Sequence, residues 1–534
     1  KNRQGALDYT LNRIQNDKYE NVPFFIFGDF NFRLDTQAVI EKITDKAPPV
    51  QVKSAKNGDV TKVLFRDPKD ENKVVLTVER KVFALQDHEE AFYWNDGKWP
   101  RTLLPGWIGE FLRTVKQYQP SFVALHCQEV GGKNYERTMP HVADFIRTLM
   151  GSEELSSYSA VQVFLDEDFS CIEKFTALGN LYFIHQSLKN TQIWDFQDCC
   201  FQPLTGKEVH SGNIEKVFTK EKVKFPQELF PECKWSRKGF MRTRWSLQGT
   251  VFDLINIHLF HDESNFIAME SFPSSYTKNR QGALDYTLNR IQNDKYENVP
   301  FFIFGDFNFR LDTQAVIEKI TDKAPPVQVK SAKNGDVTKV LFRDPKDENK
   351  VVLTVERKVF ALQDHEEAFY WNDGKWLQEH DKEPSLFKDR LFEFDISFPP
   401  SYPFKEESSG PRSYMRTRCP AWCDRILLSK SAKALVYTGH EEGSKSSTVV
   451  YHIMGPNVCM GDHKVRVPLA LLLKARRARV PARTGPPGCL GAAQLAAASC
   501  DRFPLVHGSP VLLCMIVVFA LSVVVGSFSS CLGA

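Results

Sequence analysis

The chain has 534 residues, of which 42% are hydrophobic and 25% charged, as in a globular protein with room for more than one domain. Its net charge of +3 is too small for a general nucleic-acid binder, so the sequence predicts no nucleic-acid partner. The 12 cysteines form no paired CxxC sets at zinc spacing, and they favour a reduced, cytoplasmic compartment over a disulfide framework.

One long repeat dominates the chain. Residues 1–99 recur letter for letter as residues 278–376. Repeat architectures stack several short units, whereas here a single long unit occurs twice. We interpret residues 1–99 as a partial, non-functional copy that arose by a recent exon duplication or by an error in the gene model. Two working sites remain the alternative.

The first predicted element is an amphipathic helix over residues 1–20 and again over 278–297. In the second copy, Leu284, Leu288 and Ile291 recur at i, i+4 and i+7, which places them on one helical face.

A buried strand is predicted at the apolar residues 301–304, with Gly305 opening a turn after it. Asp306, Asn308 and Arg310 follow at every second position, so on an extended backbone their side chains point the same way. A carboxylate, an amide and a guanidinium on one edge suit a phosphate group and the water that attacks it. The alternative is that Asp and Asn only break the strand into a turn.

Between the two copies, residues 107–118 predict a helix and residues 122–129 a buried strand that ends on the carboxylate of Glu129. The flexible Val-Gly-Gly loop that follows lets a ligand approach the backbone. An exposed acid at a strand end is the alternative interpretation of Glu129.

A basic stretch and a further strand come next. Residues 234–245 contain five cations among aromatic residues, which is typical of a solvated face or of a rim that attracts an anion. Residues 251–261 predict a strand in which Asn256 and His258 share one face. A lone histidine there is usually a core residue, but beside Asn256 a phosphate-facing role becomes a second hypothesis.

After the second copy, a rigid, proline-rich loop is predicted at residues 398–404. Cys419 and Cys423 have the wrong spacing and too few companions for a zinc site. Asp424 and His463 make a candidate pair, because a carboxylate on one imidazole nitrogen fixes the tautomer and raises basicity.

The composition shifts at the C-terminal side. Residues 471–510 form a basic and then Gly/Ala/Pro-rich linker, and residues 511–528 are uncharged and apolar, at the lower length limit for spanning a bilayer. This arrangement predicts a tail anchor with its positive side in the cytosol. The alternative is translated non-coding sequence without structural meaning.

Five motifs follow one another in a fixed order: Q-E at 128–129, N-x-H-L-x-H at 256–261, G-D-F-N-F-R at 305–310, P-A-W-C-D-R-I-L at 420–427 and G-D-H-K at 461–464. In this order they resemble the inositol polyphosphate 5-phosphatases, which have the DNase I / exonuclease III-like fold. The sequences of residues 125–136 and 398–403 (F-P-P-S-Y-P) resemble those of the type I enzymes. The resemblance covers roughly residues 107–465.

The resemblance implies roles for the matching residues. Asp306 would position or deprotonate the attacking water, and Asp424 would orient the imidazole of His463. The expected catalytic residues are His258, which contacts the scissile phosphate, Asp306, Asn308, which holds phosphate oxygens, Asp424 and His463. The expected ligands of Mg²⁺ are Glu129 and, beside the metal, Asp462. The expected substrate-binding residues are Lys238, Arg310, Tyr402, Arg425 and Lys464.

The resemblance also implies a fold and a domain plan. The fold is an α/β (α+β) four-layer sandwich of two mixed β-sheets with helices outside. The first strand of the family's domain, which ends in a metal-site Asn, has no counterpart before Trp107, so we expect a gap in one sheet. The expected domains are the partial copy at 1–99, the catalytic domain at 100–470, the linker at 471–510 and a membrane segment at 511–528.

The implied function is Mg²⁺-dependent removal of the 5-phosphate from soluble inositol polyphosphates such as inositol 1,4,5-trisphosphate and inositol 1,3,4,5-tetrakisphosphate, which terminates a calcium signal. We expect the protein in the cytoplasm, at the cytosolic face of the plasma membrane. Two alternatives remain. The missing strand favours a catalytically impaired, membrane-tethered binder of inositol phosphates. A nuclease of the same fold needs a broad basic groove, which the small net charge does not predict.

Overall fold

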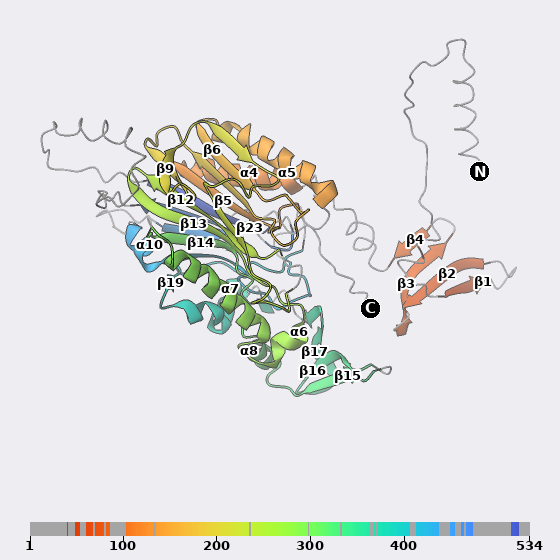
Figure 1. Cartoon of the computed structure of the whole chain (residues 1–534). Coiled ribbons are helices and arrows are strands. Elements are labelled where there is room, and N and C mark those ends of the chain that lie inside the picture. The colour runs from red at the N-terminus through yellow and green to blue at the C-terminus, as the bar shows by residue number, and fades with distance from the viewer. Residues whose placement is uncertain are drawn as a thin grey trace, which may run out of the picture. The chain divides into compact units, whose positions relative to one another are not determined.

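The computed structural model describes residues 40, 48–53, 60–67, 70–79, 82–85, 103–131, 135–233, 237–296, 298–331, 334–363, 368–369, 371–405, 413–436, 449–453, 461–463, 466–473 and 514–522. Contacts divide the chain into two compact units, Lys1–Asp96 and Gly97–Ala534 (Figure 1).

Among the described residues of the first unit, four strands form an antiparallel sheet in the order β1-β2-β3-β4. Their bounds are β1 Pro49–Lys53, β2 Val60–Asp67, β3 Asp70–Glu79 and β4 Val82–Leu85. The duplicated strands of the second unit are β15 Pro326–Lys330, β16 Val337–Asp344, β17 Asp347–Glu356 and β18 Val359–Leu362. The two sheets have the same register, because Pro49 pairs with Phe65 as Pro326 pairs with Phe342. The predicted site residues of the first copy, Asp29 and Asn31, lie outside the described residues.

In the described part of the second unit, one mixed sheet has seven strands in the order β10-β6-β7-β5-β23-β22-β21. Along the chain its strands are β5 Phe122–Gln128, β6 Ala160–Leu165, β7 Gly179–Ile184, β10 Lys207–His210, β21 Val449–Ile453, β22 Arg466–Leu473 and β23 Cys514–Ser522. The pairs β10–β6 and β23–β5 are parallel, and the others are antiparallel.

The second mixed sheet of this unit has eight strands among the described residues, in the order β19-β20-β14-β13-β12-β8-β9 with β11 beside β12. Its strands are β8 Thr191–Asp195, β9 Cys200–Pro203, β11 Glu221–Lys224, β12 Gly239–Leu247, β13 Thr250–His258, β14 Phe301–Asp306, β19 Leu391–Phe392 and β20 Asp424–Ser429. The helices are α4 Leu103–Tyr118, α5 Tyr135–Met150, η1 Glu153–Leu155, α6 Asn265–Glu270, α7 Ser275–Gln292, α8 Thr313–Ile320, η2 Trp371–His380, η3 Glu383–Phe387 and α10 Lys430–Leu435.

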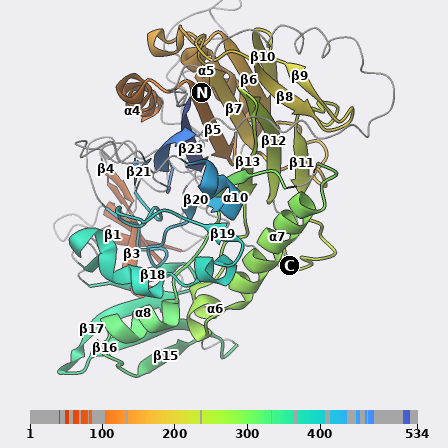
Figure 2. The same ribbon diagram turned by 90° about the vertical axis from the view of Figure 1, so that its left-hand side faces the viewer.

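The two sheets pack face to face between helices (Figures 1 and 2). Between them Phe122 of β5 meets Trp245 of β12 edge-on, with ring centroids 5.0 Å apart. On the outer side of the seven-stranded sheet, α4 and α5 bury Trp107 and Phe145 against β5 and β6. On the outer side of the eight-stranded sheet, α7 buries Leu284. The predicted four-layer sandwich is therefore confirmed, and the burial of these large apolar side chains stabilises it.

Helix α7 carries the predicted apolar stripe and confirms the helix expected at 278–297. Leu284, Leu288 and Ile291 are buried. The helix begins earlier than predicted because the side chain of Ser274 caps it by accepting a hydrogen bond from the backbone N–H of Thr277.

Gly305 does not open a turn, so that prediction is wrong. It lies inside β14, paired with Ile257 of β13 and Arg425 of β20. Its φ is 156°, and a Cβ placed here would lie 2.1 Å from the carbonyl oxygen of Ile257. Glycine therefore lets β13 approach β14 closely instead of ending the strand.

The apolar C-terminal segment supplies a strand beside β5. Strand β23 runs parallel to β5, with Ile516 opposite Phe122 and Ser522 opposite Gln128, and antiparallel to β22 on its other side. Strand β23 thus joins β5 to β22 within this sheet, whereas the sequence predicted a gap in one sheet. None of the helices in the described ranges combines the length and apolar character needed to cross a bilayer. The membrane segment at 511–528 stays a prediction.

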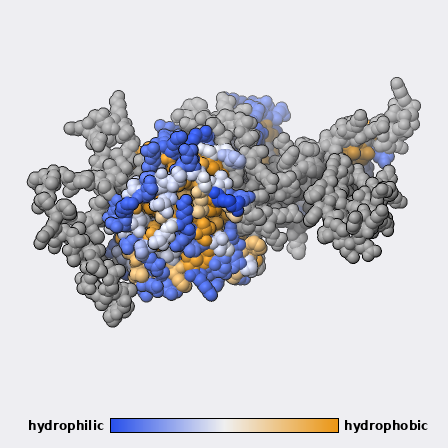
Figure 3. All heavy atoms as spheres, turned by 90° about the horizontal axis from the view of Figure 1, so that it is seen from above, coloured by the Kyte–Doolittle hydropathy of each residue, from blue (hydrophilic) through white to orange (hydrophobic). Residues whose placement is uncertain are grey.

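The surface mixes polar and apolar residues. On the face drawn in Figure 3, hydrophilic residues surround a smaller hydrophobic area. Every residue of β15 is exposed, including Val327 and Val329.

Candidate active site

Strand pairing brings three of the five predicted catalytic residues into one row. In the register of the eight-stranded sheet, His258 at the end of β13 lies opposite Asp306 at the end of β14. Asp306 in turn lies opposite Asp424 at the start of β20. Glu129 follows β5 directly, in the other sheet, and adopts a left-handed φ of 54° that is uncommon for a residue with a side chain.

Glu129 and His258 connect the two sheets. The Nε2 atom of His258 lies 3.3 Å from Asp306 Oδ2 and 3.8 Å from Glu129 Oε1. The ammonium of Lys238 contacts the same His258 nitrogen and lies 3.9 Å from Glu129 Oε1. Arg237 completes the group, with its NH2 atom 3.3 Å from Glu129 Oε2.

The segment after β14 holds Asp306, Asn308 and Arg310 together by hydrogen bonds. Asn308 donates its side-chain amide to Asp306 Oδ2 at 2.7 Å and to the carbonyl oxygen of Leu259 at 3.0 Å. Arg310 donates to Asn308 Oδ1 at 3.0 Å, and its guanidinium lies 4.2 Å from the ring centroid of Tyr402. The predicted extended backbone is wrong, because Asn308 has a φ of 51°. The three side chains converge through a left-handed turn.

His463 closes the site from the C-terminal part of the domain. Its Nδ1 atom lies 3.0 Å from Asp424 Oδ2, as the predicted orienting pair requires. The ring of Tyr402 lies 4.7 Å from the His463 ring, centroid to centroid. Ligand atoms of Asp306, Cys423 and His463 all lie within 4.8 Å of one another. Segments more than 300 residues apart therefore meet at one point.

The charges of this site are set by burial and by neighbouring ions. Burial raises the pKa of Glu129, but the cations Arg237 and Lys238 outweigh it and hold that pKa at about 2. Burial also opposes ionisation of Asp306, yet His463 and His258 lower its pKa overall. Both carboxylates are therefore ionised at neutral pH.

The two histidines have opposite charge states. Burial lowers the pKa of His258, and the nearby Lys238 ammonium lowers it further. Burial also acts to lower the pKa of His463, but Asp424 and Asp306 raise it to about 9. His258 is therefore neutral and His463 protonated at neutral pH, which divides their chemical roles.

One predicted substrate-binding residue does not join this group. Arg425 is buried in ion pairs, with NH1 2.7 Å from Asp381 Oδ2 and NH2 2.6 Å from Glu393 Oε2. This geometry favours a structural role for Arg425 over the predicted substrate contact. Lys464 lies outside the described residues. The side-chain amide of Asn256 is also engaged in hydrogen bonds within the protein. It donates to the carbonyl oxygens of Cys127 and Gly179 and to the side-chain oxygen of Asn180.

Cys419 and Arg425 have the C-x5-R spacing of cysteine phosphatases but not their environment. A nucleophilic cysteine needs a lowered pKa. Burial raises the pKa of the Cys419 thiol to about 12. Since the Arg425 guanidinium is held by carboxylates, this pair does not form a cysteine-phosphatase site.

Comparison with known proteins identifies the family. The model of Endonuclease/Exonuclease/phosphatase family 2 matches residues 353–464. Inositol polyphosphate-5-phosphatase A of Homo sapiens is 50% identical over 365 residues, which cover 68% of this chain and 88% of the relative. The relative from Canis lupus familiaris gives the same values. This chain belongs to the inositol polyphosphate 5-phosphatase family.

More distant members of this phosphatase family match over a similar extent. A Caenorhabditis elegans protein named probable type I inositol 1,4,5-trisphosphate 5-phosphatase is 35% identical over 391 residues, covering 67% of this chain and 92% of the relative. The solved inositol polyphosphate 5-phosphatase domain of SPsynaptojanin, in complex with inositol (1,4)-bisphosphate and a calcium ion, is 12% identical with a TM-score of 0.32, covering 67% of this chain and 88% of that one.

The residues predicted to hold the phosphatase's metal fit a hard divalent cation. Asp462 Oδ1 is buried and has no hydrogen-bond partner among the described residues. Burial raises the pKa of Asp462, and the negative charge of Glu129 adds to this despite the opposing effect of His463. A divalent cation between two such carboxylates would neutralise their repulsion, and oxygen ligands are those that Mg²⁺ prefers. The trio of Asp306, Cys423 and His463 fits poorly, because burial raises the Cys423 pKa and His463 is protonated.

Two residues of the site were not predicted from the sequence. Arg237 was noted only as one of five cations in a basic stretch, although its pairing with Glu129 fixes that carboxylate. His261 is the last residue of the N-x-H-L-x-H motif; its side chain is exposed, and the charges of Lys238 and Glu129 act on its pKa in opposite directions. The H-x-x-H spacing was the signal that could have identified His261.

Proposed function

We propose that this protein is a phosphoric monoester hydrolase that removes the 5-phosphate from inositol polyphosphates, with Mg²⁺ as its cofactor. Inositol 1,4,5-trisphosphate and inositol 1,3,4,5-tetrakisphosphate are the proposed soluble substrates. One observation carries the proposal. Glu129, His258, Asp306 and the His463–Asp424 pair converge in a chain that is 50% identical to inositol polyphosphate-5-phosphatases.

The ionised Asp306 supplies the base for a direct attack by water. Its carboxylate orients a water molecule and accepts a proton as the oxygen forms a bond to phosphorus. Asn308 holds Asp306 in position through its amide and through its backbone N–H, which donates to Asp306 Oδ1 at 2.8 Å. The bond between phosphorus and the 5-oxygen breaks, the 5-oxygen takes up a proton from water, Asp306 returns its proton to water, and inorganic phosphate leaves.

The remaining polar groups stabilise the negative charge that develops on the phosphoryl oxygens. His463 is protonated, and Asp424 keeps it so and fixes its orientation. His258 presents a neutral imidazole whose Nδ1 atom has no partner among the described residues. Lys238 and Arg310 add positive charge at the same place. A magnesium ion held by Glu129 and Asp462 would supply further charge neutralisation at the phosphate.

Phosphate release from inositol 1,4,5-trisphosphate tests this proposal. We expect the purified full chain to release phosphate with Mg²⁺ and to stop when a chelator is added. Asp306→Asn should lower kcat on the order of 10²–10⁴-fold, because it removes the proton acceptor. Equal activity of Asp306→Asn and wild type would contradict the mechanism.

The same assay separates the alternatives. Cleavage of plasmid DNA instead of the inositol phosphate would indicate a nuclease, and Mg²⁺-independent binding without phosphate release would indicate a catalytically impaired binder. Vesicles that contain phosphatidylinositol 4,5-bisphosphate test the proposed preference for soluble substrates. We also propose a cytoplasmic location at the plasma membrane, and fractionation of cells that express the full chain tests it.

A further inference from the structure

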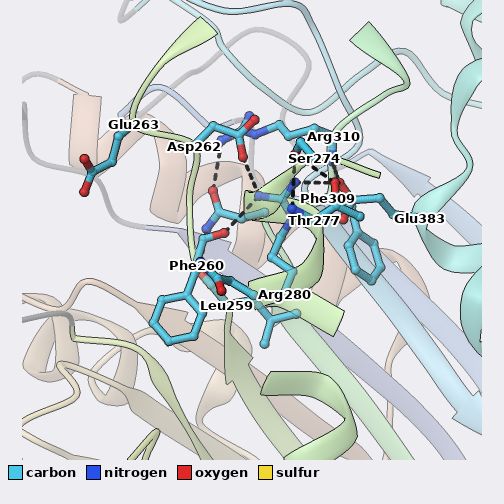
Figure 4. A network of polar contacts seen from close by, with 12 residues as sticks. Leu259, Phe260, Asp262, Glu263, Ser274, Thr277, Arg280, Phe309, Arg310 and Glu383 are labelled. Carbon is cyan, nitrogen blue, oxygen red and sulfur yellow. Dashed lines mark hydrogen bonds and ion pairs between the residues drawn. The ribbon is translucent and has the colours of Figure 1, made fainter. Parts of the chain in front are cut away.

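A fully buried arginine lies in a network of polar contacts with Asp262 and Glu383 (Figure 4). Arg280 projects from α7, and its side chain has no exposed surface. It donates two hydrogen bonds to Glu383, from Nε at 2.9 Å and from NH2 at 2.5 Å. Its NH1 atom donates to Asp262 Oδ1 at 2.5 Å and to the carbonyl oxygen of Phe260 at 3.2 Å.

Both sides of this arginine reach the segments that carry the catalytic residues. On one side, Phe260 and Asp262 follow His258 by two and four positions in the chain. On the other side, Glu383 Oε1 accepts the backbone N–H of Arg310 at 3.2 Å, two positions after Asn308. Arg280 and Glu383 therefore link the segment after β13 to the segment after β14.

The charges in this network are arranged to hold one geometry. Asp262 and Glu383 are almost fully buried and flank a single guanidinium. Thr277 adds a hydrogen bond from its hydroxyl to Glu383 Oε1 at 3.2 Å. Bidentate pairing between arginine and a carboxylate is directional, so it fixes orientation as well as distance. Apolar residues of similar volume often stabilise a core as well as a buried ion pair does, so stability alone does not account for this one.

We propose that Arg280 and Glu383 are positioning residues for phosphate hydrolysis. They set the spacing between the segment that follows β13 and the segment that follows β14, and thereby hold Asn308 where its amide donates both to the carbonyl oxygen of Leu259 at 3.0 Å and to Asp306 Oδ2 at 2.7 Å. Neither residue contacts the substrate in this proposal. The inference rests on the proposed function, because it concerns how the same site is kept in its reactive geometry.

The duplicated segment provides a matched control. Arg3 is the counterpart of Arg280 in residues 1–99, whereas Asp262 and Glu383 lie outside the duplication and occur once. A conservative change at Arg280 therefore disturbs the network. The identical change at Arg3 serves as a control, because the first copy contains no counterpart of either Asp262 or Glu383.

The test compares Arg280→Lys, Glu383→Gln and Arg3→Lys in the full chain, with kcat and KM measured on inositol 1,4,5-trisphosphate and Mg²⁺. Misplacement of reacting groups by about 1 Å can lower a rate on the order of 10²-fold. We therefore expect Arg280→Lys and Glu383→Gln each to lower kcat about 10- to 100-fold, with KM within about twofold of wild type. The double variant should be no slower than the slower single variant, because both changes break one unit. Arg3→Lys should match wild type.

Thermal unfolding shows whether each variant is folded during the assay. If Arg280→Lys does not fold, Thr277→Val decides, because it removes a single hydrogen bond to Glu383. A lower kcat with unchanged KM then supports the proposal. A folded variant with wild-type kcat, or a rise in KM alone, overturns it. An active wild type with unaffected variants refutes only the positioning role, whereas a wild type that releases no phosphate refutes the proposed function as well.

Discussion

At the scale of single residues, Gly305 shows how closely the strands approach under the site. A Cβ at this position would lie 2.1 Å from the Ile257 carbonyl oxygen and 3.0 Å from Gln128 Nε2. Real Cβ atoms do not come so near to backbone, so Gly305→Ala must push β13 away from β14. We expect the variant to be less stable by about 1–3 kcal/mol, as for an overpacked core, and to show a lower kcat. Thermal unfolding and phosphate release measure the two effects.

The control for this change is Gly28→Ala, the same substitution in the duplicated segment. Gly28 and Gly305 have identical sequence neighbours, so differences in local propensity cancel. An equal loss of stability in both variants would contradict the packing explanation.

Asp424 permits a second prediction at the residue scale. Asp424→Asn keeps the shape of the side chain but removes the charge that raises the pKa of His463 and orients its ring. Loss of such an orienting partner lowers activity on the order of 10–100-fold. We expect kcat to fall by this factor, while the exposed Asp389→Asn serves as a neutral control. Wild-type kcat in Asp424→Asn would show that the pair has no role in turnover.

Motifs in the sequence predicted the residues that now meet, but not the contacts that hold them. His258, Asp306, Asp424 and His463 each stand in a short motif. No single motif is specific, but their combination and order were sufficient to predict these four residues. The partners of Arg280 are 18 and 103 residues away along the chain. No local spacing encodes such pairs, so the network became visible only in the folded chain.

At the scale of secondary structure, β23 shows that an apolar segment admits more than one structure. Nine residues of this segment, Cys514–Ser522, pair with β5 on one side and β22 on the other. A strand buried in a sheet is apolar on both faces, so its composition resembles that of a membrane segment. Composition alone does not distinguish the two. The structure does, because it gives this segment a defined pairing register with β5 and β22.

Val518→Pro tests whether this strand completes the sheet. Proline removes a backbone N–H from a central strand and is confined to edges and bulges in natural sheets. We expect the variant to lose more than about 2 kcal/mol of stability, since a buried backbone partner is left unpaired. Val518→Thr keeps the N–H and the strand propensity while it makes the segment less apolar, so it should unfold near the wild-type temperature. Identical unfolding of Val518→Pro and wild type would show that the segment lies outside the sheet.

Other elements differed in how well their sequences identified them. Helices α4 and α7 and strands β5, β13 and β14 carry strong apolar patterns, and their existence and type were predicted correctly. Strands β15 to β18 were not assigned from the sequence. The burial pattern explains this, because β15 is exposed throughout and the first four residues of β17 are exposed. A strand that buries little has no apolar periodicity to recognise.

At the scale of the whole molecule, the site draws its residues from both sides of the duplicated segment. Glu129, His258, Asp424 and His463 all lie outside residues 278–376 and occur once in the chain. Residues 1–99 repeat Asp306 as Asp29 and its neighbours, but they contain no counterpart of these four. These four residues can therefore contribute to only one site per chain.

This single-site composition predicts the binding stoichiometry. We expect calorimetric titration of the full chain with the product-like ligand inositol 1,4-bisphosphate, in Mg²⁺, to give one site per chain. The double change Asp29→Asn and Asn31→Ala should leave both the stoichiometry and kcat unchanged, because the first copy lacks the imidazoles and the metal-binding carboxylates. The matched double change Asp306→Asn and Asn308→Ala should lower kcat at least as much as Asp306→Asn alone. Two equal sites in wild type, with one lost in the Asp29 and Asn31 variant, would show instead that the first copy assembles a site of its own.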